Sequence, residues 1–147
     1  MEIKYSERAV KQIRKIYKGD RKSAEMMLGA MESYAGNPSP GKFDIKVLKG
    51  KYGNFKRLRS GDYRIIFDDD ENVIFVYEVK HRQGHIMIKT QIIKEDRKPV
   101  AVILDYKEYL RLKEIEEDRG DYFSALDVKK KNKKWTSHRD LKKTLGL

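Results

Sequence analysis

Between Leu48 and Arg64 the sequence alternates cations with strand-forming residues, and this pattern limits what the chain can fold into. Only one acid interrupts its six cations, which are Lys49, Lys51, Lys56, Arg57, Arg59 and Arg64. Because successive side chains of a strand point to opposite faces, Arg57 and Arg59 share a face with Phe55, and Leu58 points to the other. The run therefore predicts a sheet with a core side and a strongly positive side, which would suit a phosphate chain.

Length and charge narrow the class of protein. A chain of 147 residues predicts one domain or two very small ones. The net charge of +11 favours an anionic partner, namely RNA, DNA or an acidic protein surface, although a merely soluble basic protein is the alternative. The chain has no cysteine, no secretory signal and no apolar run of about 20 residues, so we expect a cytoplasmic protein without disulfides.

The first half predicts an α+β fold with two helices before an antiparallel sheet. Ser6 is typical of an N-cap, and Gly19-Asp20 can end the helix after it. A second helix is predicted from Lys22 to Tyr34, before turn-forming residues 36–41. The predicted strands follow at Ile45–Lys49, Phe55–Ser60, Tyr63–Phe67 and Val73–His81. The acidic loop 68–72 lacks the spacing of a calcium loop, and we expect no metal and no cofactor.

Alternation also predicts which side chains face the helices. We expect the bulky sets to do so, namely Tyr63, Ile65 and Phe67 in one strand and Val73, Phe75, Tyr77 and Val79 in the next. Antiparallel pairing would then gather a charged patch on the other face, made of Arg57, Arg59, Arg64, Glu78, Lys80 and Arg82. The alternative is an ordinary solvated sheet face.

Residues 1–86 resemble a toxin of the RelE/ParE superfamily of toxin–antitoxin systems. The resemblance rests on LKG at Leu48–Gly50, RLRSGDYRIIF at Arg57–Phe67 and VYEVKHR at Val76–Arg82. It implies two helices packed on a strongly twisted antiparallel sheet. It also implies one of two activities, since RelE-like members cleave mRNA on the ribosome and ParE-like members poison DNA gyrase.

The resemblance also implies a site for RNA cleavage without a metal. Such cleavage needs a base, cations that hold the charged phosphorane, and an acid. Arg64 and Arg82 match the family's phosphate-stabilising arginines, and Arg57 matches a basic residue of RelE-like enzymes. His85 is a candidate acid or base, or else a residue of the linker. Further RNA-binding candidates are Lys49, Lys56, Arg59 and Lys80, with Glu78 as an outside candidate for the base.

Two positions depart from the RelE pattern, and one histidine fits packing better than catalysis. Ile86 stands where RelE-like toxins carry a functional tyrosine, and Phe55 stands where some members have a lysine. These residues favour RNA binding over full nuclease activity. His81 lies in the core-facing register, so we expect it to pack.

Residues 87–147 are similar to a short Phd/YefM-type antitoxin. The similarity rests on KTQIIKEDRKPVAVIL and the DYKEYLRL helix after it. Strands are predicted at Ile88–Lys94 and Pro99–Leu104, and a helix from Tyr106 to about Leu126. Thr136-Ser137 is a possible cap for a short terminal helix. An acidic stretch could lie over the arginine patch or form a solvated helix face, and it comprises Glu114, Glu116, Glu117, Asp118 and Asp121.

The leading hypothesis is a toxin–antitoxin fusion, with an mRNA interferase in residues 1–86 neutralised by residues 87–147. Since only Gln83–Met87 separate the two parts, we expect neutralisation between chains, in a homodimer or larger assembly. The alternatives are a silent regulatory module that binds operator DNA, and a ParE-like gyrase inhibitor.

Overall fold

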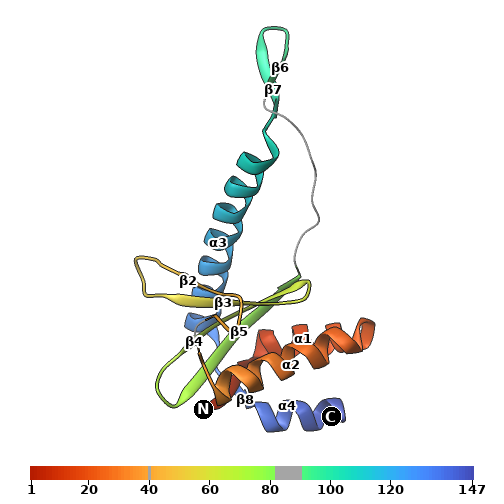
Figure 1. Cartoon of the computed structure of the whole chain (residues 1–147), viewed down its shortest axis with the longest axis vertical. Coiled ribbons are helices and arrows are strands. Elements are labelled where there is room, and N and C mark those ends of the chain that lie inside the picture. The colour runs from red at the N-terminus through yellow and green to blue at the C-terminus, as the bar shows by residue number, and fades with distance from the viewer. Residues whose placement is uncertain (40, 82–90) are drawn as a thin grey trace. The chain divides into compact units, whose positions relative to one another are not determined.

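The computed structural model describes residues 1–39, 41–81 and 91–147 (Figure 1). The chain divides into two compact units. Unit 1 consists of Met1–Arg82 together with Asp121–Leu147, and unit 2 consists of Gln83–Gly120. The chain therefore leaves unit 1, forms unit 2 and returns to unit 1.

Unit 1 contains a six-stranded, mostly antiparallel sheet in the order β2-β3-β4-β5-β1-β8. Its strands are β1 (Glu2–Ser6), β2 (Ile45–Leu48), β3 (Phe55–Ser60), β4 (Tyr63–Asp69), β5 (Val73–His81) and β8 (Trp135–Ser137). The predicted sheet was antiparallel throughout, but β1 pairs parallel with β5. β1 and β8 were not predicted, because each is short and carries too few alternating apolar residues to stand out.

Helices cover one face of this sheet. α1 (Glu7–Gly19) and α2 (Arg21–Gly36) pack there, and α4 (His138–Leu145) contributes the fully buried Leu141. The predicted N-cap of α1 is confirmed, since the Ser6 hydroxyl accepts a hydrogen bond from the Ala9 amide at 3.0 Å. The sheet residues of this core include Leu58, Ile65, Phe67, Ile74, Val76 and Val79.

The opposite face of the sheet is covered by the end of α3 (Tyr106–Lys131). Residues of α3 from Asp121 onward belong to unit 1, and they close a second core. Phe55 is central to it, with ring centroids 5.3 Å from both Tyr77 and Tyr122. Its buried members are Leu48, Phe55, Ile66, Tyr77, Tyr122, Ala125, Leu126 and Val128.

A β-bulge changes the predicted faces of β5. Ile66 of β4 pairs with Glu78, while the next residue, Phe67, pairs with Val76, so Tyr77 is an extra residue. The prediction that Phe75 and Tyr77 face α1 and α2 is therefore wrong, because both pack in the second core. Beyond the bulge the prediction is confirmed for Val79.

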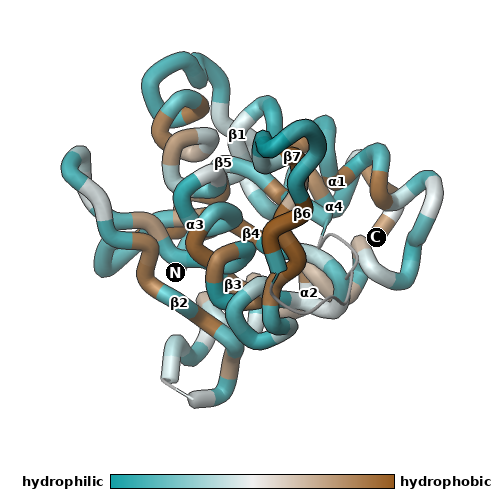
Figure 2. The backbone as a smooth tube through the Cα atoms, turned by 90° about the horizontal axis from the view of Figure 1, so that it is seen from above, coloured by the Kyte–Doolittle hydropathy of each residue, from teal (hydrophilic) through white to brown (hydrophobic). Residues whose placement is uncertain are grey.

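Unit 2 contains a β-hairpin and the first part of α3. β6 (Gln91–Glu95) and β7 (Lys98–Ile103) pair antiparallel around a two-residue turn. Asp96 and Arg97 of this turn have φ angles of +49° and +64°, which suits the right-handed twist of a hairpin. The predicted strand–turn–strand is confirmed within the described residues. Apolar residues run along both strands (Figure 2) and most are exposed.

The boundaries of the two units differ from the predicted boundary between residues 86 and 87. The sequence grouped residues 121–147 with the hairpin, whereas the structure groups them with the sheet. The two parts of unit 1 are connected by Gln83–Gly120. This connection is much longer than the five-residue link, Gln83–Met87, because of which neutralisation between chains was expected. Packing on the same chain is therefore sterically possible. None of the described helices is long and apolar enough to cross a membrane.

Candidate functional site

The predicted arginine face is covered in the structure by an acid. Arg64 of β4 donates from Nε to Asp121 Oδ2 at 3.0 Å and from Nη2 to Oδ1 at 3.1 Å. The two side chains are 6% and 1% exposed. Because two parallel hydrogen bonds join the guanidinium to the carboxylate, the pair fixes the orientation of the two side chains as well as pairing their charges. Of the predicted acidic stretch, Asp121 is the member that belongs to unit 1, and it meets the arginine patch.

Lys80 extends this ion pair into a network. Its ammonium lies 3.1 Å from Asp121 Oδ1 and 3.1 Å from Glu78 Oε1. Arg8 of α1 lies 3.3 Å from the other oxygen of Glu78. Glu78, the outside candidate for a base, is thus buried between two cations. Such pairing compensates the cost of burying a carboxylate.

Arg57 and Arg59 meet a different acid. Arg57 is 2% exposed and donates to Asp44 Oδ1 at 3.2 Å. Arg59 lies 3.9 Å from the same carboxylate, with its side chain 25% exposed. The predicted sharing of one face by Arg57 and Phe55 is consistent with their burial, and both arginines contact Asp44, the residue before β2.

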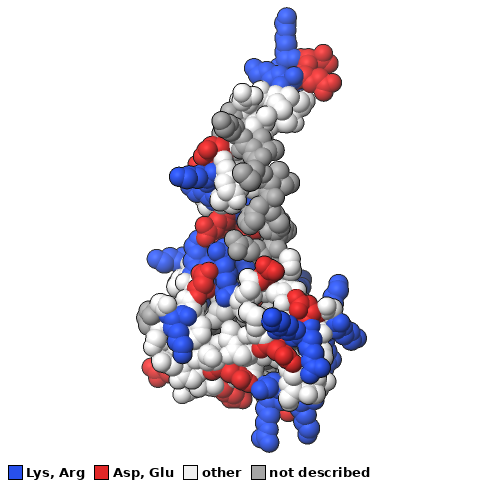
Figure 3. All heavy atoms as spheres, turned by 45° about the vertical axis from the view of Figure 1, so that its right-hand side comes forward, with Lys and Arg blue, Asp and Glu red and all other residues white. Residues whose placement is uncertain are grey.

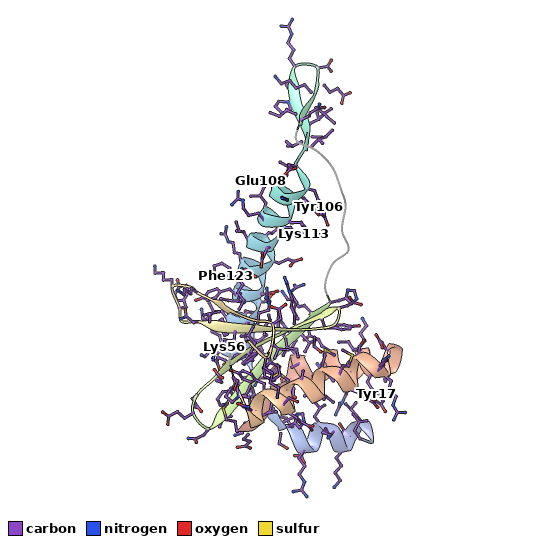
Figure 4. The ribbon with its side chains drawn as sticks, viewed as in Figure 1. Tyr17, Lys56, Tyr106, Glu108, Lys113 and Phe123 are labelled. Carbon is purple, nitrogen blue, oxygen red and sulfur yellow. The ribbon has the colours of Figure 1, made fainter. Side chains whose placement is uncertain are left out.

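The remaining predicted residues are dispersed. Lys56, which is labelled in Figure 4, lies on the face of α1 and α2, 2.8 Å from Asp69 and 3.3 Å from the Tyr34 hydroxyl. Lys49 is exposed in the turn after β2. His81 packs edge to face against Tyr63, but it is exposed at the end of β5, so its predicted place in the core is wrong. Arg82, His85 and Ile86 lie outside the described residues, so their predicted roles remain predictions.

Tyr122 holds the β2–β3 loop against the helix end. Its hydroxyl accepts a hydrogen bond from the Tyr52 amide at 2.8 Å. A Cβ atom on Gly50 would lie 2.0 Å from Tyr122 Cζ, so only glycine permits this approach. The glycine of the LKG motif therefore serves contact with the C-terminal segment. Sequence reasoning missed this role, because nothing in the motif indicates what approaches it.

After α3 the C-terminal segment is fixed to the first strand and first helix. Asn132 Oδ1 accepts from the Glu7 amide at 3.0 Å, so it adds to the capping of α1. β8 then pairs antiparallel with β1, with Thr136 opposite Tyr5. The predicted Ser137 cap is confirmed, since its hydroxyl accepts from the Asp140 amide at 3.1 Å.

A polar chain ties α4 to α2. His138 Nδ1 lies 2.7 Å from the Tyr5 hydroxyl, and its Nε2 lies 2.7 Å from Glu32 Oε1. Lys142 donates to the same oxygen at 2.8 Å. Hydrogen bonds from Lys142 and His138 lower the pKa of Glu32. Burial, together with the negative charge of Glu32, raises the pKa of Tyr5. This contact was not predicted, because its residues are far apart in the sequence.

The excess positive charge of the chain lies entirely in unit 1. Unit 1 has 26 Lys and Arg against 15 Asp and Glu, whereas unit 2 has eight of each. Cations are spread over the face of unit 1 in Figure 3, with acids between them. The C-terminal segment, residues 121–147, is itself basic, with eight cations against three acids. Its docking therefore depends on apolar burial and on the local pair at Asp121 rather than on net charge.

Comparison with known proteins gives one family and one solved structure. Residues 3–85 match the family described as the ParE toxin of type II toxin–antitoxin systems, parDE. Residues of the chain also superpose on the YoeB dimer from Staphylococcus aureus, at 19% identity and a TM-score of 0.49, covering 56% of this chain and 98% of that one. No curated protein matches the sequence.

Proposed function

Since this chain belongs to the ParE toxin family of type II toxin–antitoxin systems, we propose that it is a toxin held silent by its own C-terminal segment. Residues 1–82 supply the toxin fold, and residues 121–147 act as the antitoxin. Unit 2 connects the two. The proposal retains the predicted toxin–antitoxin fusion but assigns neutralisation to a shorter segment and to the same chain.

The observation that carries this proposal is the ion pair of Arg64 with Asp121. Arginine binds a phosphate through the same two N–H groups that it presents to a carboxylate. Asp121 engages Nε and Nη2 of Arg64, so a phosphate and Asp121 compete for one fork. The competition takes place in a buried site, where an ion pair is poorly screened. Docking of α3 therefore excludes a nucleic-acid backbone from Arg64.

For the latent activity we propose cleavage of mRNA on the ribosome. Arg64 and Arg57 would stabilise the charge that develops on the phosphorane, and Lys80 would add a second cation beside Arg64. The acid and base would come from Glu78 and from the predicted His85. Arg82 would complete the phosphate contacts. The density of cations around Arg64 supports this assignment.

The second candidate is inhibition of DNA gyrase. The family match favours it, because the matching description names the ParE toxin. In that case the sheet face would bind a protein, and cleavage residues would be unnecessary. Both candidates share the same silencing contact, so one set of variants tests them together.

The test is release of the helix end by charge reversal. Asp121→Arg places a third cation beside Arg64 and Lys80, which should expel this part of α3. Asp127→Arg is the matched control, because Asp127 is on the same helix but 44% exposed. Each full-length protein is assayed for ribosome-dependent mRNA cleavage and for gyrase supercoiling.

The leading assignment expects mRNA cleavage from Asp121→Arg alone, and its loss when Arg64→Ala is added. Inhibited supercoiling with intact mRNA would support the gyrase candidate instead. The Tyr52 amide, which donates to the Tyr122 hydroxyl, reports whether the end of α3 has been released. If this amide loses its protection from hydrogen exchange and neither activity appears, the chain is a silent module. Binding of operator DNA would then be the remaining function to examine.

We also infer that the chain self-associates through unit 2. Ile92 and Val102 lie directly opposite each other in the hairpin and are 61% and 57% exposed, and Val100 of the same strand as Val102 is 56% exposed. A two-stranded hairpin alone is marginal in water. Unit 2 is electrically neutral, so two copies would not repel each other as two copies of unit 1 would. These features support a homodimer in which each chain neutralises itself.

A further inference from the structure

The β2–β3 loop of unit 1 presents an aromatic ring to solvent. Tyr52 is 59% exposed, although its backbone is held by the hydrogen bond to the Tyr122 hydroxyl. The ring itself has no place in either core. An exposed tyrosine on an ordered loop loses little conformational freedom when another ring stacks on it.

A second ring lies close by, on the helix that fixes this loop. Phe123, labelled in Figure 4, is 50% exposed and contacts Tyr122 at a centroid distance of 5.4 Å. Tyr122 thus links the two exposed residues, since it bonds to the backbone of Tyr52 and touches the ring of Phe123. The two rings come from different parts of the sequence, and docking of the C-terminal segment links both of them to Tyr122.

Lysines from both parts of unit 1 surround the Tyr52 ring. Lys130 Nζ lies 5.4 Å from its centroid, and Lys51 Nζ lies 5.9 Å from it. Lys49 is exposed two residues before Lys51 on the same loop. These cations stand at the distance at which an ammonium interacts with an aromatic face, and they remain open to water. A base that stacks on Tyr52 would displace these ammonium groups from the ring, and they would then bind the phosphates on either side of it.

We propose that this aromatic–basic patch, made of Lys49, Lys51, Tyr52, Phe123 and Lys130, binds single-stranded nucleic acid. The patch is separate from the arginine site, because it faces solvent while Arg64 is covered. It exists when the chain is in its silenced state. The proposal does not depend on the toxin activity and stands if the latent activity is either candidate.

A single strand fits better than a duplex for a geometric reason. The faces of paired bases are hidden in the stack of a duplex, whereas an unpaired base can lie flat on Tyr52. Proteins that bind single strands combine aromatic rings with cations that follow the backbone. The two exposed rings would accept two bases, and the three lysines would contact the phosphates between and beside them.

The test measures fluorescence anisotropy of the full-length protein with labelled oligonucleotides of about 12 nucleotides. RNA, DNA of the same sequence, and the DNA duplex are the three probes. We expect both single strands to bind more tightly than the duplex. Tyr52→Ala should weaken binding about tenfold, while Tyr52→Phe should retain it. Lys130→Ala should reduce the slope of log K against log salt by about 0.7.

Lys22→Ala is the charge-matched control, since Lys22 is an exposed lysine of α2 on the other face of the sheet. It should leave the affinity nearly unchanged. An equal preference for RNA and DNA, or a preference for one, identifies the strand and supports the patch. Tighter binding of the duplex, equal losses in Lys22→Ala and Lys130→Ala, or an unchanged affinity in a folded Tyr52→Ala protein would overturn it.

Discussion

The carboxylate of Asp121 accepts two hydrogen bonds from the guanidinium of Arg64, at 3.0 and 3.1 Å, inside the second core of unit 1. The partners are 57 residues apart and come from the toxin fold and the C-terminal segment. Each compensates the charge of the other in a place where water is excluded. Docking of the C-terminal segment therefore covers the Arg64 guanidinium through this pair.

Removal of either Asp121 or Arg64 should lower the stability of the folded protein. Asp121→Ala leaves the charge of Arg64 buried and should lower the free energy of unfolding by about 3–5 kcal/mol. Asp127→Ala, at an exposed position of the same helix, should cost about 1 kcal/mol or less. Urea denaturation followed by circular dichroism measures both.

A double replacement separates two contributions to the loss of stability, namely the unpaired charge of Arg64 and the loss of packing at position 121. Arg64→Met combined with Asp121→Leu removes both charges and should recover most of the stability lost in Asp121→Ala. If the double variant is as unstable as the single one, the pair is not what holds the helix end.

Gly50 should not tolerate a side chain. In Gly50→Ala the new methyl group would meet the Tyr122 ring at 2.0 Å, so the helix end or the loop must move. The expected result is faster hydrogen exchange at the Tyr52 amide, which bonds to the Tyr122 hydroxyl. Adding Tyr122→Ala should remove the clash, and unchanged exchange in Gly50→Ala would contradict the close approach.

The elements that sequence reasoning located best are those set by local pattern. β3 and β5 have the predicted bounds, and Ser6 and Ser137 cap their helices, because period-two alternation and capping are properties of neighbouring residues. The predicted face of β5 failed at one bulge. A single extra residue at Tyr77 reverses alternation on one side of it, and no local signal marks that residue.

The sequence identified arginines of the candidate site, but it did not predict that they would be buried. Arg57 and Arg64 were selected from the sequence as members of a positive face, yet both are buried. Their burial depends on contacts with Asp44 and Asp121, and the second of these is long-range. The acidic stretch indicated that some acid could cover the face. It did not indicate which one, because most of that stretch belongs to unit 2.

Acid should weaken the attachment of α4. The folded-state pKa of Glu32 is lowered, so its contribution is present above the unfolded pKa of about 4.3 and is lost as the pH falls through the lower folded value. Glu32→Gln should therefore be less stable than wild type at pH 7, by about 1 kcal/mol or less, and the difference should shrink as the pH falls below about 4. Thermal unfolding at several pH values measures it, and a constant difference would contradict the assignment.

Leu141 should be the main apolar anchor of α4. It is fully buried, so Leu141→Ala should cost about 2–5 kcal/mol. Leu147→Ala is the control, because Leu147 is 39% exposed and should cost far less. Chemical denaturation compares them. Equal losses would mean that α4 is held by its polar contacts instead.

The exposed face of the hairpin should mediate self-association. Val102→Lys places a charge opposite Ile92, where the inferred dimer would bury it, so the molar mass from light scattering should fall from dimer to monomer. Lys94→Glu is the control, because it changes a charge in the same hairpin, on strand β6, without replacing an apolar side chain. A wild-type monomer at micromolar concentration would contradict self-association through unit 2.

The central claim is that residues 121–147 silence the toxin in the same chain. Its most direct test is the growth of a bacterial culture after induction of wild type, Asp121→Arg and Asp127→Arg at equal soluble levels. We expect growth arrest with Asp121→Arg alone, and restored growth when Arg64→Ala is added. Continued growth with soluble Asp121→Arg, in which the Tyr52 amide exchanges freely, would contradict it.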